Sequence, residues 1–133
     1  TQVVLPLLET DFVDIIKAIH AGTLNQLDIQ WKKGCVACVI MASGGYPKKY
    51  ATGLPISGLN EKGQLDSAFV YHAGTRYENG TFLTAGGRVL GVTVAGDTLQ
   101  QALDGAYAAV EQIRFEGAHY RKDIGQRALA CGK

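Results

Sequence analysis

The sequence predicts an α+β fold, mainly antiparallel β-sheet with two packing helices. Short runs rich in β-branched and aromatic residues fill the middle of the chain and are separated by turn residues, a pattern typical of antiparallel strands. Segments with apolar residues at helical spacing flank this region, and the order helix, strands, helix indicates α+β rather than α/β. With 133 residues, 47% of them hydrophobic and 19% charged, the chain has the size and composition of one domain, residues 1–133.

Two helices are expected, the first over residues 11–21 and the second from residue 98 to about residue 113. In the first, Thr10 or Asp11 is the N-cap, and Gly22 follows as the C-terminal cap. The second has the most regular apolar repeat of the chain, with Asp97 as its predicted cap and Gln100 at the capping-box position. The apolar opening before the first helix is unlike a solvated tail, and we expect it to be cut from a larger protein.

The strands are expected to begin with residues 35–42, whose sequence CVACVIMA predicts a central strand buried on both faces. Residues 43–67 hold two prolines and five glycines, which predicts a long loop containing one short strand near residues 54–57. A β meander is expected next, with Asn79-Gly80 as a type I′ hairpin turn. Its strands are predicted over residues 68–72, 75–78, 81–85 and 88–95.

Charge and composition argue against several classes of partner. The formal net charge is +1 and no run of Lys or Arg exceeds two residues, so we expect neither a nucleic acid nor a membrane surface as partner. The chain has no apolar stretch near the ~20 residues that cross a bilayer and no secretory pattern at its start, which favours the cytoplasm. Cys35 and Cys38 are interpreted as buried structural cysteines rather than a metal or redox pair, because a strand places residues three apart on opposite faces.

Three strings containing glycine are the candidate functional segments: SGGYPKKY from Ser43, HAGT from His72 and GGRVLGVT from Gly86. Glycine allows a positive φ and a close approach of backbone N–H groups to a ligand, so these strings suggest an anion such as phosphate. In the loop from Ser43 through Gly44 and Gly45 to Tyr46, the N–H groups and the hydroxyl are candidates for ligand contact. The alternative is a turn that only shapes a cleft. His72 is interpreted as a hydrogen-bonded structural residue rather than a general base.

Four strings in this order resemble the C-terminal domain of glycinamide ribonucleotide synthetase, also called phosphoribosylamine-glycine ligase, of the ATP-grasp superfamily: VIMASGGYPKKYATG, FVYHAGT, TAGGRVLGVT and FEGAHYRKDIGQRAL. The resemblance covers essentially the whole chain and implies the fold of an ATP-grasp C-terminal domain. It also implies the reaction of the full-length protein. ATP phosphorylates the carboxylate of glycine, and the amine of 5-phosphoribosylamine then displaces phosphate, giving glycinamide ribonucleotide, ADP and phosphate. Magnesium or manganese is the implied metal.

The resemblance also assigns residues. Arg88 matches a strand arginine of related purine ATP-grasp enzymes that reaches the sugar phosphate of their substrate, and a guanidinium suits this role because it donates two parallel hydrogen bonds. Gly87 would leave room for the ligand beside the strand. Arg76 holds a position where the family usually has a basic residue, and it is a candidate second phosphate contact. The alternatives are a carboxylate-paired Arg88 and a solvated Arg76.

Thr1-Gln2 resembles the end of a family string, GDPETQ, whose carboxylate ligates magnesium and would lie just before this chain. We therefore expect ATP and the metal to bind mainly outside these residues, no catalytic residue within them, and no activity from the chain alone. Its expected partners are the small-molecule substrates and the ATP-grasp lobes of the same protein. A freestanding ligand-binding or regulatory module, a dimerisation domain, and a fused multifunctional parent remain open as alternatives.

Overall fold

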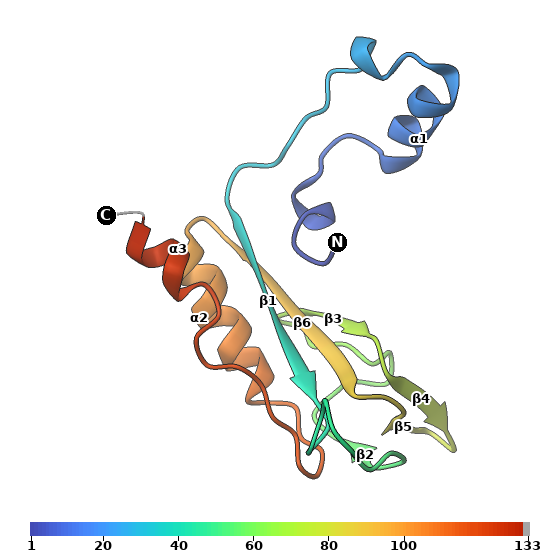
Figure 1. Ribbon diagram of the computed structural model, residues 1–133, viewed down its shortest axis with the longest axis vertical. Coiled ribbons are helices and arrows are strands. Elements are labelled where there is room, and N and C mark those ends of the chain that lie inside the picture. The colour runs from blue at the N-terminus through green and yellow to red at the C-terminus, as the bar shows by residue number, and fades with distance from the viewer. Residues whose placement is uncertain (132–133) are drawn as a thin grey trace.

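The computed structural model describes residues 1–131, which form two small antiparallel sheets, a helix packed on one of them, and an N-terminal arm (Figure 1). The α+β class and the antiparallel strands are confirmed. The elements, in chain order, are η1 (Leu5–Leu7), α1 (Phe12–Ala21), η2 (Leu24–Gln26), β1 (Cys35–Ala42), β2 (Pro55–Ile56), β3 (Phe69–His72), β4 (Thr75–Glu78), β5 (Thr81–Thr84), β6 (Arg88–Gly96), α2 (Leu99–Val110) and α3 (Gln126–Cys131).

The first sheet has the strand order β1-β6-β3, and α2 packs on one of its faces. Val39, Val92 and Val70 pair across the three strands and are all 1% exposed or less, because they face the helix. Alternate residues of a strand point to opposite faces, so this row fixes which side of the sheet forms the core. Gly105 of α2 allows the close approach, since a Cβ there would lie 2.8 Å from Val94 Cγ1.

The expected meander is wrong in its strand order. The long apolar strand β6 lies between β1 and β3, where both of its edges are paired, while β4 and β5 belong to a second sheet of order β2-β5-β4. The predicted hairpin is confirmed between β4 and β5, and its turn residues Asn79 and Gly80 have φ values of 48° and 79° as a type I′ turn requires.

The expectation that β1 is buried on both faces is also wrong. Val39 and Met41 face α2, but Ile40 between them is 37% exposed and Cys38 is half-buried. The face opposite α2 carries no second layer of helix or sheet from the described residues. We call it the open face, and it is formed by Val36, Cys38, Ile40, Phe69, Tyr71, Gly91 and Thr93. Cys35 and Cys38 therefore lie on opposite faces, as predicted, and both are half-buried rather than fully buried.

The helix ends follow local signals. Asp11 caps α1 by accepting a 2.7 Å hydrogen bond from Val13 N, and Gly22 ends the helix in the left-handed conformation. The predicted cap of α2 is wrong by one residue, since Thr98, not Asp97, is the N-cap. Thr98 and Gln101 form a reciprocal capping box, because both side chains reach the partner's backbone N–H at 3.2 Å.

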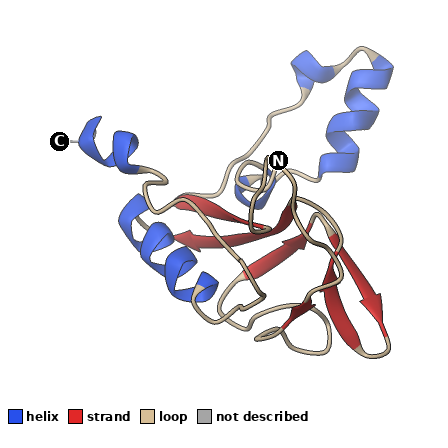
Figure 2. Cartoon of the chain, turned by 60° about the horizontal axis from the view of Figure 1, so that its bottom comes forward, coloured by secondary structure: helices blue, strands red, loops and turns tan. Residues whose placement is uncertain are grey.

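Residues 1–33 form the N-terminal arm, which lies on the opposite side of the sheet from α2 (Figures 1 and 2). Lys32 N donates to Leu7 O at 2.8 Å and joins the two ends of the arm. Of the two predicted helices, α2 packs on the sheet, whereas α1 packs within the arm against η2. No helix in residues 1–131 is long and apolar enough to span a membrane.

Candidate substrate-binding cavity

A cavity of about 460 Å³ lies at the start of β6, on the open face. The three glycine-containing strings meet here: Tyr46 comes from the first, Ala73 and Gly74 from the second, and residues 86–88 from the third. Gln2 of the arm and Ile40 of β1 complete most of the remaining wall. Segments far apart in the sequence thus line one cavity.

Close backbone packing explains why glycines surround the cavity. A Cβ on Gly74 would lie 2.8 Å from Gly86 Cα, and Ala85 N donates to Gly74 O at 2.7 Å. A Cβ on Gly87 would lie 2.1 Å from Tyr46 Cδ2, because the tyrosine ring rests directly against this glycine. The glycines therefore let the second and third strings touch and hold Tyr46 at the edge of the cavity.

Ser43 connects the loop after β1 to the third string. Its N–H donates to Gly87 O and its hydroxyl to Gly86 O, both at 2.8 Å, and the residue is 1% exposed. Gly44 packs against the backbone of Gly117, and Gly45 has a φ of 94° in the turn that Tyr46 follows. None of the first three residues of this loop lines the cavity, so their contact with a ligand stays a prediction. In the structure they hold the cavity's edge in place.

Arg88 supplies the charge of the cavity. Its side chain is exposed, and no carboxylate among residues 1–131 lies within ion-pairing distance of it. The alternative of a carboxylate-paired arginine is therefore not found in this part of the chain. No residue that lines the cavity is acidic, so the cavity has a single positive charge.

The backbone beneath this side chain is held from two sides. Arg88 pairs with Ala42 of β1, and the carbonyl of the next residue, Val89, accepts hydrogen bonds from Ala73 N and Gly74 N at 3.0 Å each. The first residue of β6 is thus fixed where both strand neighbours meet it.

Arg76 lies elsewhere. It is in β4, opposite Leu83 of β5, and its Nε is 3.1 Å from Glu78 Oε1 with both side chains about half exposed. Such an exposed pair is weak, so Arg76 remains free to exchange partners. It does not line the cavity with Arg88, and its role as a second phosphate contact stays a prediction.

His72 has the structural role that the sequence suggested. Its Nε2 donates to Gly63 O and its Nδ1 shares a hydrogen bond with the Thr75 hydroxyl, both at 2.8 Å. Both ring nitrogens are therefore occupied in fixing the loop before β3 to the start of β4. Among residues 1–131, no three His, Cys, Asp or Glu side chains gather in a group that could hold a metal ion.

The comparison with known families gives one match, described as "Phosphoribosylglycinamide synthetase, C domain", over residues 36–127. The chain belongs to this family. The chain is 48% identical over 124 residues to a phosphoribosylamine-glycine ligase of Caldanaerobacter subterraneus, which covers 93% of the chain and 29% of the relative. It is 45% identical over 130 residues to a bifunctional purine biosynthetic protein of Dictyostelium discoideum, covering 97% of the chain and 16% of the relative.

A solved structure agrees with the fold of the C domain. The crystal structure of phosphoribosylamine-glycine ligase from Thermotoga maritima matches with a TM-score of 0.76 and 29% sequence identity, over 91% of this chain and 29% of that one. The C domain thus spans about 30% of the length of the ligases that it matches.

Sequence reasoning missed Gln2, which lies in the arm before the residues that match the family, as a residue of the cavity. The available signal was the resemblance of Thr1-Gln2 to the end of the string GDPETQ, from which a metal ligand was expected just before this chain. Nothing local indicates that the start of the arm meets the start of β6, because this contact depends on how the arm folds back over the open face.

Proposed function

We propose that this C domain is part of a phosphoribosylamine-glycine ligase and that its cavity binds the 5′ phosphate of phosphoribosylamine through Arg88. The observation that carries the proposal is a guanidinium without an ion-pair partner in the described residues, in a cavity with no acidic lining residue and with a glycine-rich wall. A phosphate accepts two parallel hydrogen bonds from an arginine, and a nearby carboxylate would compete for it.

The domain binds and orients the substrate, and it performs none of the bond-making. In the proposed reaction, ATP held by other parts of the ligase phosphorylates the glycine carboxylate. The amine of phosphoribosylamine then attacks the carbonyl carbon, expels phosphate and loses a proton. Arg88 holds the far end of the sugar phosphate, so the amine is presented in a restricted set of positions. Tyr46 and Gly87 limit how deeply the sugar enters.

ATP and magnesium or manganese are proposed to bind outside residues 1–133, glycine is the second substrate, and the ligase is expected in the cytoplasm. The curated ligases of similar sequence support this proposal over a freestanding ligand-binding module, because each contains the domain as a part of a longer enzyme.

Steady-state kinetics of the full-length ligase test the assignment. Arg88→Ala should raise the KM for phosphoribosylamine about tenfold or more, which corresponds to a charge-assisted contact of ~1.5–3 kcal/mol. The KM values for ATP and glycine should change little. The KM of Arg88→Lys for phosphoribosylamine should lie between that of the unchanged ligase and that of Arg88→Ala, since a lysine keeps the charge but not the two parallel hydrogen bonds.

Arg76→Ala is the matched control, because it removes an exposed arginine that does not line the cavity. An unchanged KM in this variant supports a one-arginine phosphate site. A rise equal to that of Arg88→Ala would restore the predicted two-arginine site, and an unchanged KM in Arg88→Ala would refute the assignment of Arg88.

A further inference from the structure

The turn between β4 and β5 has a chemistry that the ligase reaction does not use. Asn79 and Gly80 are its two central residues, and both are exposed. They lie at the tip of a hairpin that projects away from α2 (Figures 1 and 2). The side-chain amide of an asparagine is an electrophile within reach of the main-chain nitrogen of the next residue, because that attack closes a cyclic imide. The sequence of this turn therefore places a nucleophile next to an electrophile.

Gly80 leaves this attack unobstructed. A Cβ built on Gly80 would meet no heavy atom within 4 Å beyond its chain neighbours, so the space around its main-chain nitrogen is open to water. Among residues 1–131, no acceptor takes a hydrogen bond from Gly80 N–H, and the side chain of Asn79 forms none. Neither the attacking nitrogen nor the amide is therefore held by another contact in this part of the chain.

The other asparagines of the chain lack these properties. Asn60 Oδ1 accepts two main-chain hydrogen bonds, both at 3.0 Å, which fix its amide in the loop before β3. The residue after it is Glu61, and Asn25 is followed by Gln26. At both places a Cβ stands beside the main-chain nitrogen, whereas glycine has none. Asn79 is thus the asparagine at which the attack meets the least hindrance.

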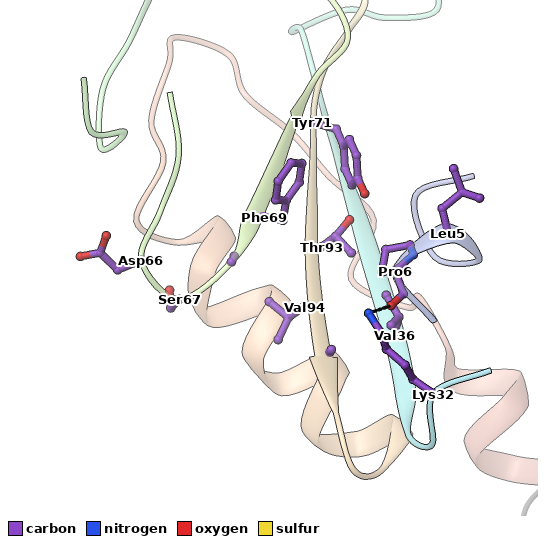
Figure 3. Close-up of a pocket in the computed structure, with 12 residues that line it drawn as sticks. Leu5, Pro6, Lys32, Val36, Asp66, Ser67, Phe69, Tyr71, Thr93 and Val94 are labelled. Carbon is purple, nitrogen blue, oxygen red and sulfur yellow. Dashed lines mark hydrogen bonds between the residues drawn. The ribbon is translucent and has the colours of Figure 1, made fainter. Parts of the chain in front are cut away.

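Two aspartate pairs show the same contrast. Asp66 and Ser67 form another two-residue turn, closed by an antiparallel bridge, at the rim of a cavity of about 590 Å³ on the open face (Figure 3). Ser67 carries a Cβ, and a carboxylate is a poor electrophile. Asp104 precedes Gly105 inside α2, where the helix holds the main-chain N–H in a hydrogen bond. Neither pair combines an amide, a glycine and an open turn, as Asn79-Gly80 does.

We infer that Asn79 is a site of spontaneous covalent modification, at which the side-chain amide is lost and isoaspartate accumulates. Gly80 N gives up its proton to hydroxide and attacks Asn79 Cγ. The bond from Cγ to the amide nitrogen then breaks, and ammonia leaves with a proton taken from water. A water molecule opens the cyclic imide, and cleavage at Cγ gives aspartate, whereas cleavage at the α-carbonyl carbon gives isoaspartate. The step needs only water, and it does not depend on the assignment of Arg88.

Isoaspartate changes the hairpin more than aspartate does. Its main chain runs through Cβ and Cγ, so it adds one carbon to a turn that closes the strands with φ values of 48° at Asn79 and 79° at Gly80. Since the turn sets the register of the hairpin, the pairing of Glu78 with Thr81 beside it should be lost first. Either product also adds a negative charge next to Glu78, which already pairs with Arg76.

Incubation of the 133-residue chain and of the full-length ligase in a mildly alkaline buffer tests the inference. Peptide mass spectrometry follows loss of the amide, and an isoaspartate-specific methyltransferase labels the isoaspartate. Asn79 should lose its amide at least about tenfold faster than Asn25 or Asn60, because the nitrogen of a glycine attacks without a Cβ beside it. In the modified chain, the amides of β4 and β5 should exchange about fivefold faster or more, with α2 unchanged.

Asn79→Gly is the matched control. A Gly-Gly pair also suits a type I′ turn, so this variant keeps the hairpin and removes the amide, and methyl labelling of the peptide that contains the turn should fall to background. Labelling of that peptide in Asn79→Gly would overturn the inference. So would equal loss of amide at Asn25, Asn60 and Asn79, or full protection of Asn79 in the full-length ligase. Unchanged exchange in β4 and β5 after isoaspartate has formed would refute the effect on the hairpin.

Discussion

Replacing Gly87 by alanine tests how the cavity wall is built. The new Cβ would lie 2.1 Å from Tyr46 Cδ2 and 2.5 Å from Cε2, far inside the 3.4 Å at which ordinary contact begins. The φ of Gly87 lies outside the left-handed region, so alanine meets no backbone strain and the clash is the whole structural effect. Ser43 N holds Gly87 O at 2.8 Å, so the tyrosine ring must move rather than the backbone.

The magnitude follows from two opposing terms. Overpacking costs about 1–3 kcal/mol, and alanine stabilises the native state by ~0.4–1 kcal/mol through the unfolded chain. Tyr46 is 36% exposed and can swing outward, so the net loss should lie near the lower end, about 1–2 kcal/mol. For a chain of this size the unfolding midpoint should fall by roughly 4–8 °C.

Thermal unfolding of a double-mutant cycle is the assay. Tyr46→Ala removes the ring, so Gly87→Ala should lower the free energy of unfolding little or not at all in that background. The coupling free energy between the two substitutions should then equal most of the loss measured for Gly87→Ala alone. An equal cost in both backgrounds would refute the proposed contact between ring and glycine.

Three further changes test other features of the chain. Thr98→Ala removes the cap of α2 and should lower the free energy of unfolding by about 1 kcal/mol, measured by urea denaturation, while Gln101→Ala should cost less because a backbone N–H at a helix start can turn to water. Thr93→Val removes a buried hydroxyl that has no partner in the described residues, so it should stabilise the 133-residue chain by ~1 kcal/mol in the same assay, and a loss of stability would show that the hydroxyl is satisfied. Burial raises the pKa of the Cys38 thiol, so its thiolate fraction near neutral pH is small and grows only as the pH rises. Iodoacetamide should therefore modify the exposed Cys131 well before Cys38, as mass spectrometry of peptides can follow, and the reverse order would contradict the burial of Cys38.

Elements with a local signal were predictable from the sequence. The first helix, strand β1 and the β4–β5 hairpin were each predicted within a residue, because caps, β-branched runs and the Asn79-Gly80 turn act over short distances. The position of β6 between β1 and β3 was not predictable in this way, since it depends on which strand is stabilised most by hydrogen-bonded neighbours on both of its edges. Thr98 replaced Asp97 as cap because two adjacent residues both suit the position, and only the packing of α2 decides between them.

The candidate site was partly predictable for a related reason. Glycine strings indicate close backbone approaches, and the three strings do meet at one cavity. Which side chains then face the cavity depends on geometry between distant segments. The hydroxyl of Ser43 points to Gly86 O, and Arg76 turns to Glu78 in the second sheet, while Gln2 reaches the cavity from the arm. The Arg76–Glu78 pair is local, because residues two apart in a strand share a face, whereas the directions of Ser43 and Gln2 depend on segments distant in the sequence.

The two-sided support of β6 at its first residue determines how this domain could respond to a bound anion. Ala42 pairs with Arg88, and the N–H groups of Ala73 and Gly74 both donate to the carbonyl of Val89. The main chain at the start of β6 is therefore held in place. Capture would then be a matter of rotamer choice in one long side chain, with an ordering cost of roughly 2 kcal/mol and no loop rearrangement to slow it. A rigid backbone that carries one flexible side chain favours rapid exchange of the ligand over slow, tight retention.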